Sequence, residues 1–433
     1  MKNVSVVEVN INTIDARTLQ QWAECYCEIW KEPPWLEDFW KPEDVIADFR
    51  KEMARKHSVA FLALNEGSVV GFTHGYSVGR DELKDIAGSD LLDGLFKENE
   101  RLFYVDELGV VAKYRGNRIS LKLTKALLRA AYVKGLCDIV LRTDIKADAA
   151  RHVYEELGFT ELNVHDAAYP DRTYWLCRLD PSGFMKLFNF DVSKSLWIGV
   201  ERECFIEDRE GNIVPRAPHI LNGIDSNGMF GYELSACQIE SRIGPCELGD
   251  IRQYLEDSDE SLKCIMDNNG VKARHVEVGL ENMSLEVYPD PSGRYQEIVK
   301  TMPRHVLLAA CRVIGTHIHV GMPDHETALK AYNKVIGRCD WLCSKGNGSF
   351  GERLDIYRTV APECDPLSYR DWHDFYRVAC VRGFDEDPRK CWTLIRISRH
   401  GTIEFRMFGA TSSIDRIVGW AKLCHDLCAE AMA

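Results

Sequence analysis

The segment of residues 197–206 constrains the fold of this chain more than any other stretch. Successive side chains of a strand point to opposite faces, so Glu201 and Glu203 share one face of this segment. The opposite face is mostly apolar, with Arg202 among the apolar side chains. Carboxylates are costly to bury unless they are paired or bind a metal ion, and hard divalent cations prefer oxygen ligands. The segment therefore predicts a metal-binding strand, with a solvated acidic edge strand as the alternative.

Two later segments carry similar side chains on predicted strands. Glu240 lies in the predicted strand 235–243, and His317 and His319 lie in residues 315–321, which have a glycine at each end. Two histidines separated by one residue on a strand face the same way, which suits metal or phosphate binding. The glycines allow close approach of a ligand or another backbone segment.

The last strand signal is a hairpin near the carboxyl end. Residues 393–399 and 402–408 form its two predicted strands, and Glu404 and Arg406 point to one face of the second strand. Together with the earlier strands, this pattern predicts that acids and imidazoles distant in sequence converge on shared divalent cations.

Residues 346–351 match the glycine pattern G-x-G-x-x-G. In a dinucleotide-binding turn this pattern follows a strand and opens a helix, whereas here a predicted helix ending at Cys343 precedes it. We therefore interpret the segment as a flexible loop over a site, followed by Arg353 and Arg358.

In the first half, helices are predicted over residues 16–30, 43–56 and 81–99, the last interrupted near Gly88, and a hairpin joins strands 59–65 and 68–78 at Glu66-Gly67. A strand over 102–111 then enters a basic turn, and an amphipathic helix follows over 120–133. The free N–H groups of a first helical turn attract anions, and Arg115 and Arg118 add positive charge. A phosphate-binding turn and an ordinary solvated basic turn both fit these residues.

A predicted strand at 138–143 and a helix at 147–157, ended by Gly158-Phe159, complete the pattern. This order resembles the GNAT family of acetyl-CoA-dependent N-acetyltransferases over roughly residues 1–180. The matching residues are Val110, Val111, Arg115, Gly116, Asn117, Arg118 and Ile119, and later Ala150, Tyr154, Gly158 and Phe159. The resemblance implies that the turn, extended to Ser120, holds the pyrophosphate of acetyl-CoA.

The resemblance also implies two catalytic roles. Tyr154 would protonate the departing thiolate, and Glu107 would take a proton from the acceptor amine, directly or through water. Without the resemblance, Tyr154 is a core aromatic of an amphipathic helix and Glu107 an acid at the end of a strand. The chain departs from the family at Arg118, where Gly or Ala is usual, and at Ala147, where Asn is frequent.

The second half resembles the type 2 glutamate–cysteine ligase family of carboxylate–amine ligases, and more broadly amidoligases with a glutamine-synthetase-like fold. The matching segments are residues 199–203, 238–240, 315–321, 349–350, 357–358 and 401–406, within roughly residues 193–433. The resemblance implies that the γ-phosphoryl group of ATP activates a carboxylate and that an amine then displaces phosphate. Cys204 in place of the usual aromatic residue and a short loop at Phe350 leave both substrates open.

The ligase resemblance implies a set of site residues. Mg²⁺ or Mn²⁺ ions would be held by Glu201, Glu203, Glu240, His317 and Glu404. Arg406 and Arg358 would stabilise the transferring phosphoryl group or the substrate carboxylate, whereas His319 would contact the nucleotide or support a ligand.

A chain of 433 residues is too long for one ordinary core. The break Asp180-Pro181-Ser182-Gly183 separates a predicted GNAT domain, residues 1–182, from a predicted ligase domain, residues 190–433. The predicted fold class is α+β. It comprises a GNAT mixed sheet flanked by helices, followed by a glutamine-synthetase-like, mostly antiparallel sheet with helices on its outer face.

The formal net charge of −13 argues against general affinity for nucleic acid or for anionic membranes. The 16 cysteines include no C-x-x-C pair, and neither a signal peptide nor a membrane-spanning run is evident, so we expect free thiols and a cytoplasmic protein. The predicted partners are small-molecule carboxylate and amine substrates, and a homodimer is left open.

The leading hypothesis is a bifunctional enzyme. One half would join a small, amino-acid-like carboxylate to an amine using ATP and Mg²⁺, and the other would acetylate a related amine. One alternative keeps only the acetyltransferase active, with the second half a substrate-binding module. Another makes the second half a metal-dependent amide hydrolase that does not use ATP.

Overall fold

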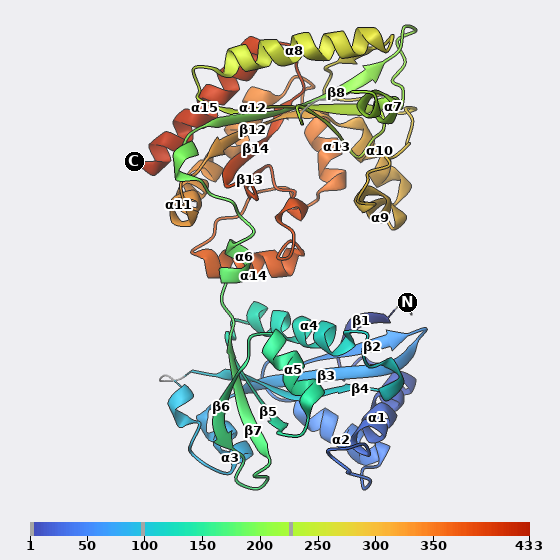
Figure 1. Cartoon of the computed structure of the whole chain (residues 1–433), viewed down its shortest axis with the longest axis vertical. Helices are drawn as coiled ribbons and strands as arrows, with labels where there is room; N and C mark the ends of the chain where they lie inside the picture. The colour runs from blue at the N-terminus through green and yellow to red at the C-terminus, as the bar shows by residue number, and fades with distance from the viewer. Residues whose placement is uncertain (1–3, 97–99, 225–227) are drawn as a thin grey trace. The chain divides into compact units, whose positions relative to one another are not determined.

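A computed structural model describes residues 4–96, 100–224 and 228–433. The chain forms two compact units, Met1–Pro181 and Ser182–Ala433, and each is built on its own sheet of seven strands (Figure 1). Within the described ranges, none of the helices combines the length and apolar character needed to cross a membrane. The predicted α+β class is confirmed.

The first unit has a mixed sheet with strand order β1-β2-β3-β4-β5-β7-β6. Its strands are β1 (Val4–Val9), β2 (Val59–Asn65), β3 (Ser68–Val78), β4 (Leu102–Val110), β5 (Asp138–Asp144), β6 (Thr160–His165) and β7 (Arg172–Arg178). Its helices are α1 (Ala16–Trp30), α2 (Pro42–Met53), α3 (Arg80–Ala87), α4 (Ile119–Val133) and α5 (Asp148–Glu156). In Figure 1, α1 and α2 lie on one side of this sheet and α4 on the other.

Local sequence signals account for several of these elements. The side chain of Asp15 caps α1 by accepting a hydrogen bond from the N–H of Thr18 at 2.9 Å. Glu66 and Gly67 both have positive φ, 50° and 79°, as a tight turn between two strands requires. Strands β1 and β6 were not predicted. The helix expected over 81–99 is shorter, because α3 ends at Ala87 with Gly88 as its left-handed cap, and residues 97–99 lie outside the described ranges.

Strands β4 and β5 diverge, and this divergence positions the first site. They pair in parallel only where Phe103–Val105 meets Ile139–Leu141. Beyond Val105, β4 continues to pair with β3, whereas β5 pairs with β7. The second half of β4 therefore has no strand partner on its β5 side among the described pairings, and this side faces a cleft.

The second unit has an antiparallel sheet with strand order β13-β14-β12-β8-β10-β9, and β11 pairs with the end of β8. Its strands are β8 (Ile198–Glu207), β9 (Phe230–Tyr232), β10 (Gln238–Cys246), β11 (Lys272–Arg274), β12 (Gly315–Gly321), β13 (Ile395–Ser398) and β14 (Thr402–Gly409). Its helices are α6 (Ser182–Met185), α7 (Ala217–Asn222), α8 (Ile251–Asn268), α9 (Arg294–Lys300), α10 (Arg304–Arg312), α11 (His325–Val335), α12 (Cys339–Gly346), α13 (Glu352–Val360), α14 (Trp372–Arg382) and α15 (Ile414–Met432).

Helices α8 and α15 cover one face of this sheet (Figure 1). Ile198, Val200 and Ile318 point into the core on this face. Arg202 lies there too, as the alternation in β8 predicted, and its buried guanidinium pairs with Asp259 on α8 and donates to the carbonyl oxygen of Thr411. The opposite face of the sheet is therefore left for the acidic side chains.

Some predicted elements differ in extent. The sequence pattern also predicts extended segments over residues 271–279 and 284–288, but these residues contain only the short β11 and isolated bridges at Val278 and Val287. The pattern likewise predicts a helix over residues 295–313, and the structure breaks it at Pro303 into α9 and α10, because proline supplies no N–H for an intrahelical hydrogen bond. The helix before the glycine-rich loop ends at Gly346 rather than at Cys343. Phe184 and Phe188, next to the predicted break, pack in the core of the second unit.

Candidate active sites

A cleft of about 710 Å³ opens where β4 and β5 diverge in the first unit. Its walls include Leu108–Val110 of β4, the turn before α4 and the face of α5 that carries Tyr154. Of the turn residues predicted to bind a cofactor, Arg115, Gly116, Arg118, Ile119 and Ser120 line the cleft, as does Val110. Val111 instead packs in the core, and Asn117 holds the turn by donating to the carbonyl oxygens of Tyr114 and Arg115.

The turn before α4 contains two residues in the left-handed conformation. Gly116 and Arg118 both have positive φ, 74° and 57°. A left-handed conformation favours glycine, so Arg118 occupies a backbone position that its side chain does not favour. Both arginines are paired with acids: Arg115 Nη1 lies 2.6 Å from Glu32 Oε2, and Arg118 pairs with Glu156. The turn thus places the start of α4 and two guanidinium groups at the cleft, an arrangement that suits an anion.

Glu107 and Tyr154 both line this cleft. Burial, and then the charge of nearby Asp106, raises the pKa of Glu107 well above its usual value. Burial and the charge of Glu107 also raise the pKa of Tyr154, so its phenol keeps its proton near neutral pH. A carboxyl group with a raised pKa and a protonated phenol suit a general base and a general acid, respectively.

A bulge in β4 places two acids opposite one histidine, a contact that the sequence did not reveal. His74 pairs with Glu107 and Gly75 pairs with Val105, so Asp106 is the extra residue of the bulge. The ring nitrogen Nε2 of fully buried His74 lies 2.8 Å from Glu52 Oε2 and 3.7 Å from Asp106 Oδ2. Although burial opposes protonation, hydrogen bonds to Asp106 and Glu52 raise the pKa of His74 to about 10.

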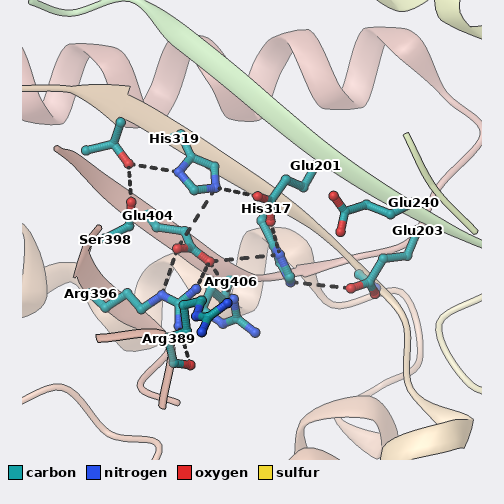
Figure 2. Close-up of polar contacts among 12 residues, drawn as sticks. Glu201, Glu203, Glu240, His317, His319, Arg389, Arg396, Ser398, Glu404 and Arg406 are labelled. Atoms are coloured by element: carbon teal, nitrogen blue, oxygen red, sulfur yellow. Dashed lines mark hydrogen bonds and ion pairs between the residues drawn. The ribbon is translucent and has the colours of Figure 1, made fainter. Parts of the chain in front are cut away.

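The second site follows from the register of the second sheet. Glu240 pairs with Glu203, Glu201 with His317, and His319 with Glu404, each directly opposite the other on neighbouring strands. Directly opposed residues of antiparallel strands point to the same face, as do residues i and i+2 of one strand. All six side chains therefore lie on one face of β10, β8, β12 and β14 (Figure 2).

The distances within this face are short. Glu201 Oε2 lies 3.0 Å from His317 Nδ1, and Glu201 Oε1 lies 3.4 Å from His319 Nε2. His317 Nε2 lies 3.9 Å from Glu203 Oε1, and both histidines lie 4.0 Å from an oxygen of Glu404. One potential ligand atom from each of Glu201, His319 and Glu404 lies within 4.8 Å of the other two. This donor set of two carboxylates and an imidazole suits a divalent cation.

The carboxyl groups of the second site differ in pKa, because different charges surround them. Burial opposes ionisation of Glu404, but the charges of Arg396 and Arg406 hold its pKa below its usual value. Burial likewise opposes ionisation of Glu201, and the two histidines lower its pKa. At Glu203 burial dominates and raises the pKa, even though the N–H of Gly315 donates to its carboxylate at 2.6 Å. Glu201 and Glu404 therefore ionise at lower pH than Glu203.

Glu240 and Glu233 form a second acidic group beside Glu203. Arg242 Nε lies 2.7 Å from Glu240 Oε1. Burial, together with a hydrogen bond to Glu240, raises the pKa of Glu233 well above its usual value. Glu233 was not among the predicted ligands, although its position seven residues before Glu240 was noticeable in the sequence.

Arg396 is the clearest site residue that sequence reasoning missed. Its Nε lies 2.7 Å from Glu404 Oε2 and its Nη2 lies 3.1 Å from Glu404 Oε1, while Arg406 Nη1 lies 2.5 Å from Glu404 Oε1 (Figure 2). Two guanidinium groups therefore hold one buried carboxylate. The signal was available, because Arg396 lies opposite Glu404 in the predicted hairpin.

Helix α13 contributes a different arginine from the one predicted. Arg358 pairs with Asp355 at 3.0 Å on the surface of the helix, and among the described residues it makes no ion pair with the carboxylates of the second site. Arg353 is buried and donates to the carbonyl oxygens of Ile314, Arg406 and Met407. Gly315 makes this possible, because a Cβ there would lie 2.2 Å from Arg353 Nη2.

The side chain of Glu277 holds the backbone of the glycine-rich loop, residues 346–351. The N–H groups of Gly348 and Ser349 donate to the buried carboxylate of Glu277 at 2.6 and 3.0 Å. A helix, α12, precedes the loop, so the rejection of a dinucleotide-binding turn agrees with the structure. Phe350 is fully exposed on this loop.

Comparisons with known proteins match the two units of the chain to two different groups of proteins. The model of the acetyltransferase (GNAT) family matches residues 19–159, and N-alpha-acetyltransferase 30 of Schizosaccharomyces pombe is 43% identical over 56 residues, 13% of this chain and 37% of that protein. "Putative glutamate--cysteine ligase 2" of Gloeobacter violaceus is 25% identical over 264 residues, 55% of this chain and 69% of that protein. "Putative glutamate--cysteine ligase 2-1" of Rhodococcus jostii is 29% identical over 157 residues, 34% of this chain and 39% of that protein. The chain thus carries an N-terminal GNAT acetyltransferase domain, followed by a part homologous to these ligase-like proteins.

Proposed function

We propose that this chain is a bifunctional enzyme with two chemically independent sites. The first transfers an acetyl group from acetyl-CoA to an amine. The second joins a small carboxylate to an amine at the expense of ATP. The single observation that carries the second assignment is the register that places Glu201, His319 and Glu404 on one sheet face beside two arginines.

The arrangement of the cleft supports acetyl transfer. The amides at the start of α4 and the guanidinium groups of Arg115 and Arg118 would hold the CoA pyrophosphate. The unpaired edge of β4 offers backbone N–H and C=O groups to the amide groups of the cofactor. Glu107 would take the proton of the attacking amine, and Tyr154 would give a proton to the departing thiolate.

The donor set of the second site supports a divalent cation. Glu201, His319 and Glu404 would hold Mg²⁺ or Mn²⁺, with His317 supporting Glu201, and Glu203 and Glu240 would provide oxygens for a second ion. When bound, these ions would offset the repulsion between the nucleotide phosphates and the substrate carboxylate.

The arginines of the second site have distinct roles in this proposal. Arg396 contacts Glu404 through two nitrogens and donates through Nη1 to the carbonyl oxygen of Cys391 at 2.7 Å, so it orients the carboxylate. Arg406 contacts Glu404 through one nitrogen, and its buried Nε has no partner among the described residues. The guanidinium of Arg406 can therefore donate to an additional anion, the transferring phosphoryl group or the substrate carboxylate.

The two proposed activities can be separated by their products. ADP formation should require ATP, Mg²⁺, a carboxylate and an amine together, whereas CoA release should require acetyl-CoA and an amine only. A screen of amino acids and amines for ADP formation tests the ligase proposal. ADP formation that needs no carboxylate, or amide hydrolysis without ATP, would contradict it.

A further inference from the structure

The charges that line the acetyl-transfer cleft are unevenly balanced near Glu107. Arg142 Nη1 lies 2.5 Å from Asp166 Oδ2, and Arg172 Nη2 lies 3.2 Å from Glu37 Oε1, so both cations in this part of the cleft are already paired. Each of these two cations is therefore already balanced by one acid.

The acids beside Glu107 outnumber the cations that face them. Glu52, Asp106 and Glu107 lie around His74, whose single positive charge is shared between Glu52 and Asp106. Glu107 receives one hydrogen bond from the hydroxyl of Tyr26, at 3.4 Å. Carboxyl groups therefore outnumber basic groups at this end of the cleft, and a positively charged substrate would favour their ionised forms.

A second, smaller cavity lies on the α1–α2 side of Glu107. It has a volume of about 10 Å³, which is room for one water-sized group, and an ammonium group is of that size. Tyr26 and Trp40 form aromatic walls with ring centroids 5.6 Å apart, and Asp48 and Glu52 add carboxylates. Aromatic faces and carboxylates together attract ammonium ions.

We propose that the acetyl acceptor is a small aliphatic diamine that carries no carboxylate beside its amine, with one amine at Glu107 and the second ammonium in the cavity formed by Tyr26, Trp40, Asp48 and Glu52. This inference rests on the acetyl transfer proposed above and names the acceptor of that same site. The amine nitrogen forms a bond to the acetyl carbon as the C–S bond breaks. Its proton passes to Glu107, and the thiolate of CoA receives a proton from Tyr154.

Three compounds of equal chain length test the proposal with the full chain and acetyl-CoA: 1,4-diaminobutane, 1-aminobutane and 4-aminobutanoate. We expect kcat/KM for CoA release to be about tenfold higher for the diamine than for 1-aminobutane, and lowest for 4-aminobutanoate. Equal rates for the diamine and the monoamine, or a preference for 4-aminobutanoate, would overturn the inference.

Two variants on α2 locate the second ammonium. Asp48→Asn should lower kcat/KM for 1,4-diaminobutane about fivefold and leave that for 1-aminobutane unchanged. Asp44→Asn, an exposed acid on the same helix that does not line the cavity, is the matched control and should change neither. Equal losses in both variants would show a general charge effect and contradict the assigned cavity.

Binding measurements keep the inference distinct from the proposed reaction. If the chain binds acetyl-CoA but no amine releases CoA, the proposed acetyl transfer fails. Calorimetric titration of the three compounds then still decides the inference. Tighter binding of the diamine that weakens in Asp48→Asn supports it, and similar affinities for all three compounds refute it.

Discussion

At the scale of single residues, buried carboxylates in both units are held by cations or N–H groups. Glu404 accepts hydrogen bonds from Arg396 and Arg406, and Glu277 accepts them from two backbone amides. In the first unit, Asp166 accepts hydrogen bonds from Arg142, Tyr174 and the amides of Ala168 and Tyr169. Such groups are costly to disrupt, because removing one partner leaves the others buried and unpaired.

We expect Asp166→Asn to lower the free energy of unfolding at pH 7 by about 2–4 kcal/mol, because it leaves the Arg142 guanidinium without its carboxylate. Although burial opposes its ionisation, Arg142 and the other donors lower the pKa of Asp166 below 3.8, the value for the unfolded chain. As the pH falls, the unfolded chain therefore takes up this proton first. The stabilisation is complete above pH 3.8 and declines as the pH drops toward the folded-state pKa.

Denaturant unfolding of wild type and Asp166→Asn at several pH values measures this effect. The difference in the free energy of unfolding between the two proteins should become smaller below pH 3.8. Asp171→Asn, which removes an exposed partner of Lys146, is the control and should stay near wild type. A constant difference across the acid range would refute the predicted pKa shift.

Arg115→Ala should weaken acetyl-CoA binding about tenfold, because a charged hydrogen bond to a phosphate contributes about 1.5–3 kcal/mol and part of it replaces the existing pair with Glu32. Calorimetric titration with acetyl-CoA measures the change. Lys122→Ala removes an exposed charge from the same helix, α4, outside the residues that line the cleft, and should bind like wild type. Unchanged affinity in Arg115→Ala would remove the support for the pyrophosphate assignment.

At the scale of elements, strand register determines which polar side chains from distant parts of the chain meet. The bulge in β4 turns Asp106 and Glu107 toward His74, and the pairing of β8 with β12 brings Glu201 to His317. A second bulge, between Thr316 and Ile318, changes the register of β12 on β14. The pairing of β8 with β12 thus places two site residues that lie 116 positions apart in the sequence beside one another.

The loop of residues 346–351 is an element whose order depends on one side chain. Glu277→Ala should remove the acceptor of the Gly348 and Ser349 amides, raise their hydrogen-exchange rates at least about tenfold and destabilise the fold by about 1–3 kcal/mol. Hydrogen exchange measured by mass spectrometry reports on both amides. Glu281→Ala, a largely exposed acid four residues later, is the control. Unaltered exchange in Glu277→Ala would mean that other contacts hold the loop.

At the scale of the whole molecule, the chain consists of two units, each with its own sheet and core clusters. Domain fusion places two proposed activities on one polypeptide without requiring that they share a catalytic group. The ligase-like relatives extend over the second part of the chain, and the GNAT family model extends over the first.

We expect Glu404→Gln to abolish ADP formation and to leave CoA release with an amine unchanged, because Glu404 belongs to the second unit only. Loss of this buried charge leaves Arg396 and Arg406 without their carboxylate, so a fall of about 3 kcal/mol in the stability of the second unit is expected as well. Glu201→Gln, at a less buried position, tests the same chemistry with less disturbance of the fold.

Coupled assays of ADP and CoA on the same preparations measure both activities. Glu297→Gln, an exposed acid paired with Lys300, is the control and should retain both. Parallel loss of ADP formation and CoA release in Glu201→Gln would contradict two independent sites.

The sequence by itself determined the features that depend on neighbouring residues. Alternation predicted the faces of β8, Glu66-Gly67 predicted a hairpin turn, and the order of strand, basic turn and helix predicted the turn that precedes α4. Each follows from local backbone sterics and side-chain direction, which a short window of sequence contains.

Only the tertiary structure decided which side chains meet. It placed His319 beside Glu201 and Glu404, buried Arg353 against the carbonyl oxygen of Ile314, left Arg358 paired at the surface and set Asp106 beside His74. These contacts depend on register and on bulges across strands that are distant in sequence. A shift of one residue would turn each side chain to the other face, and no local pattern specifies that shift.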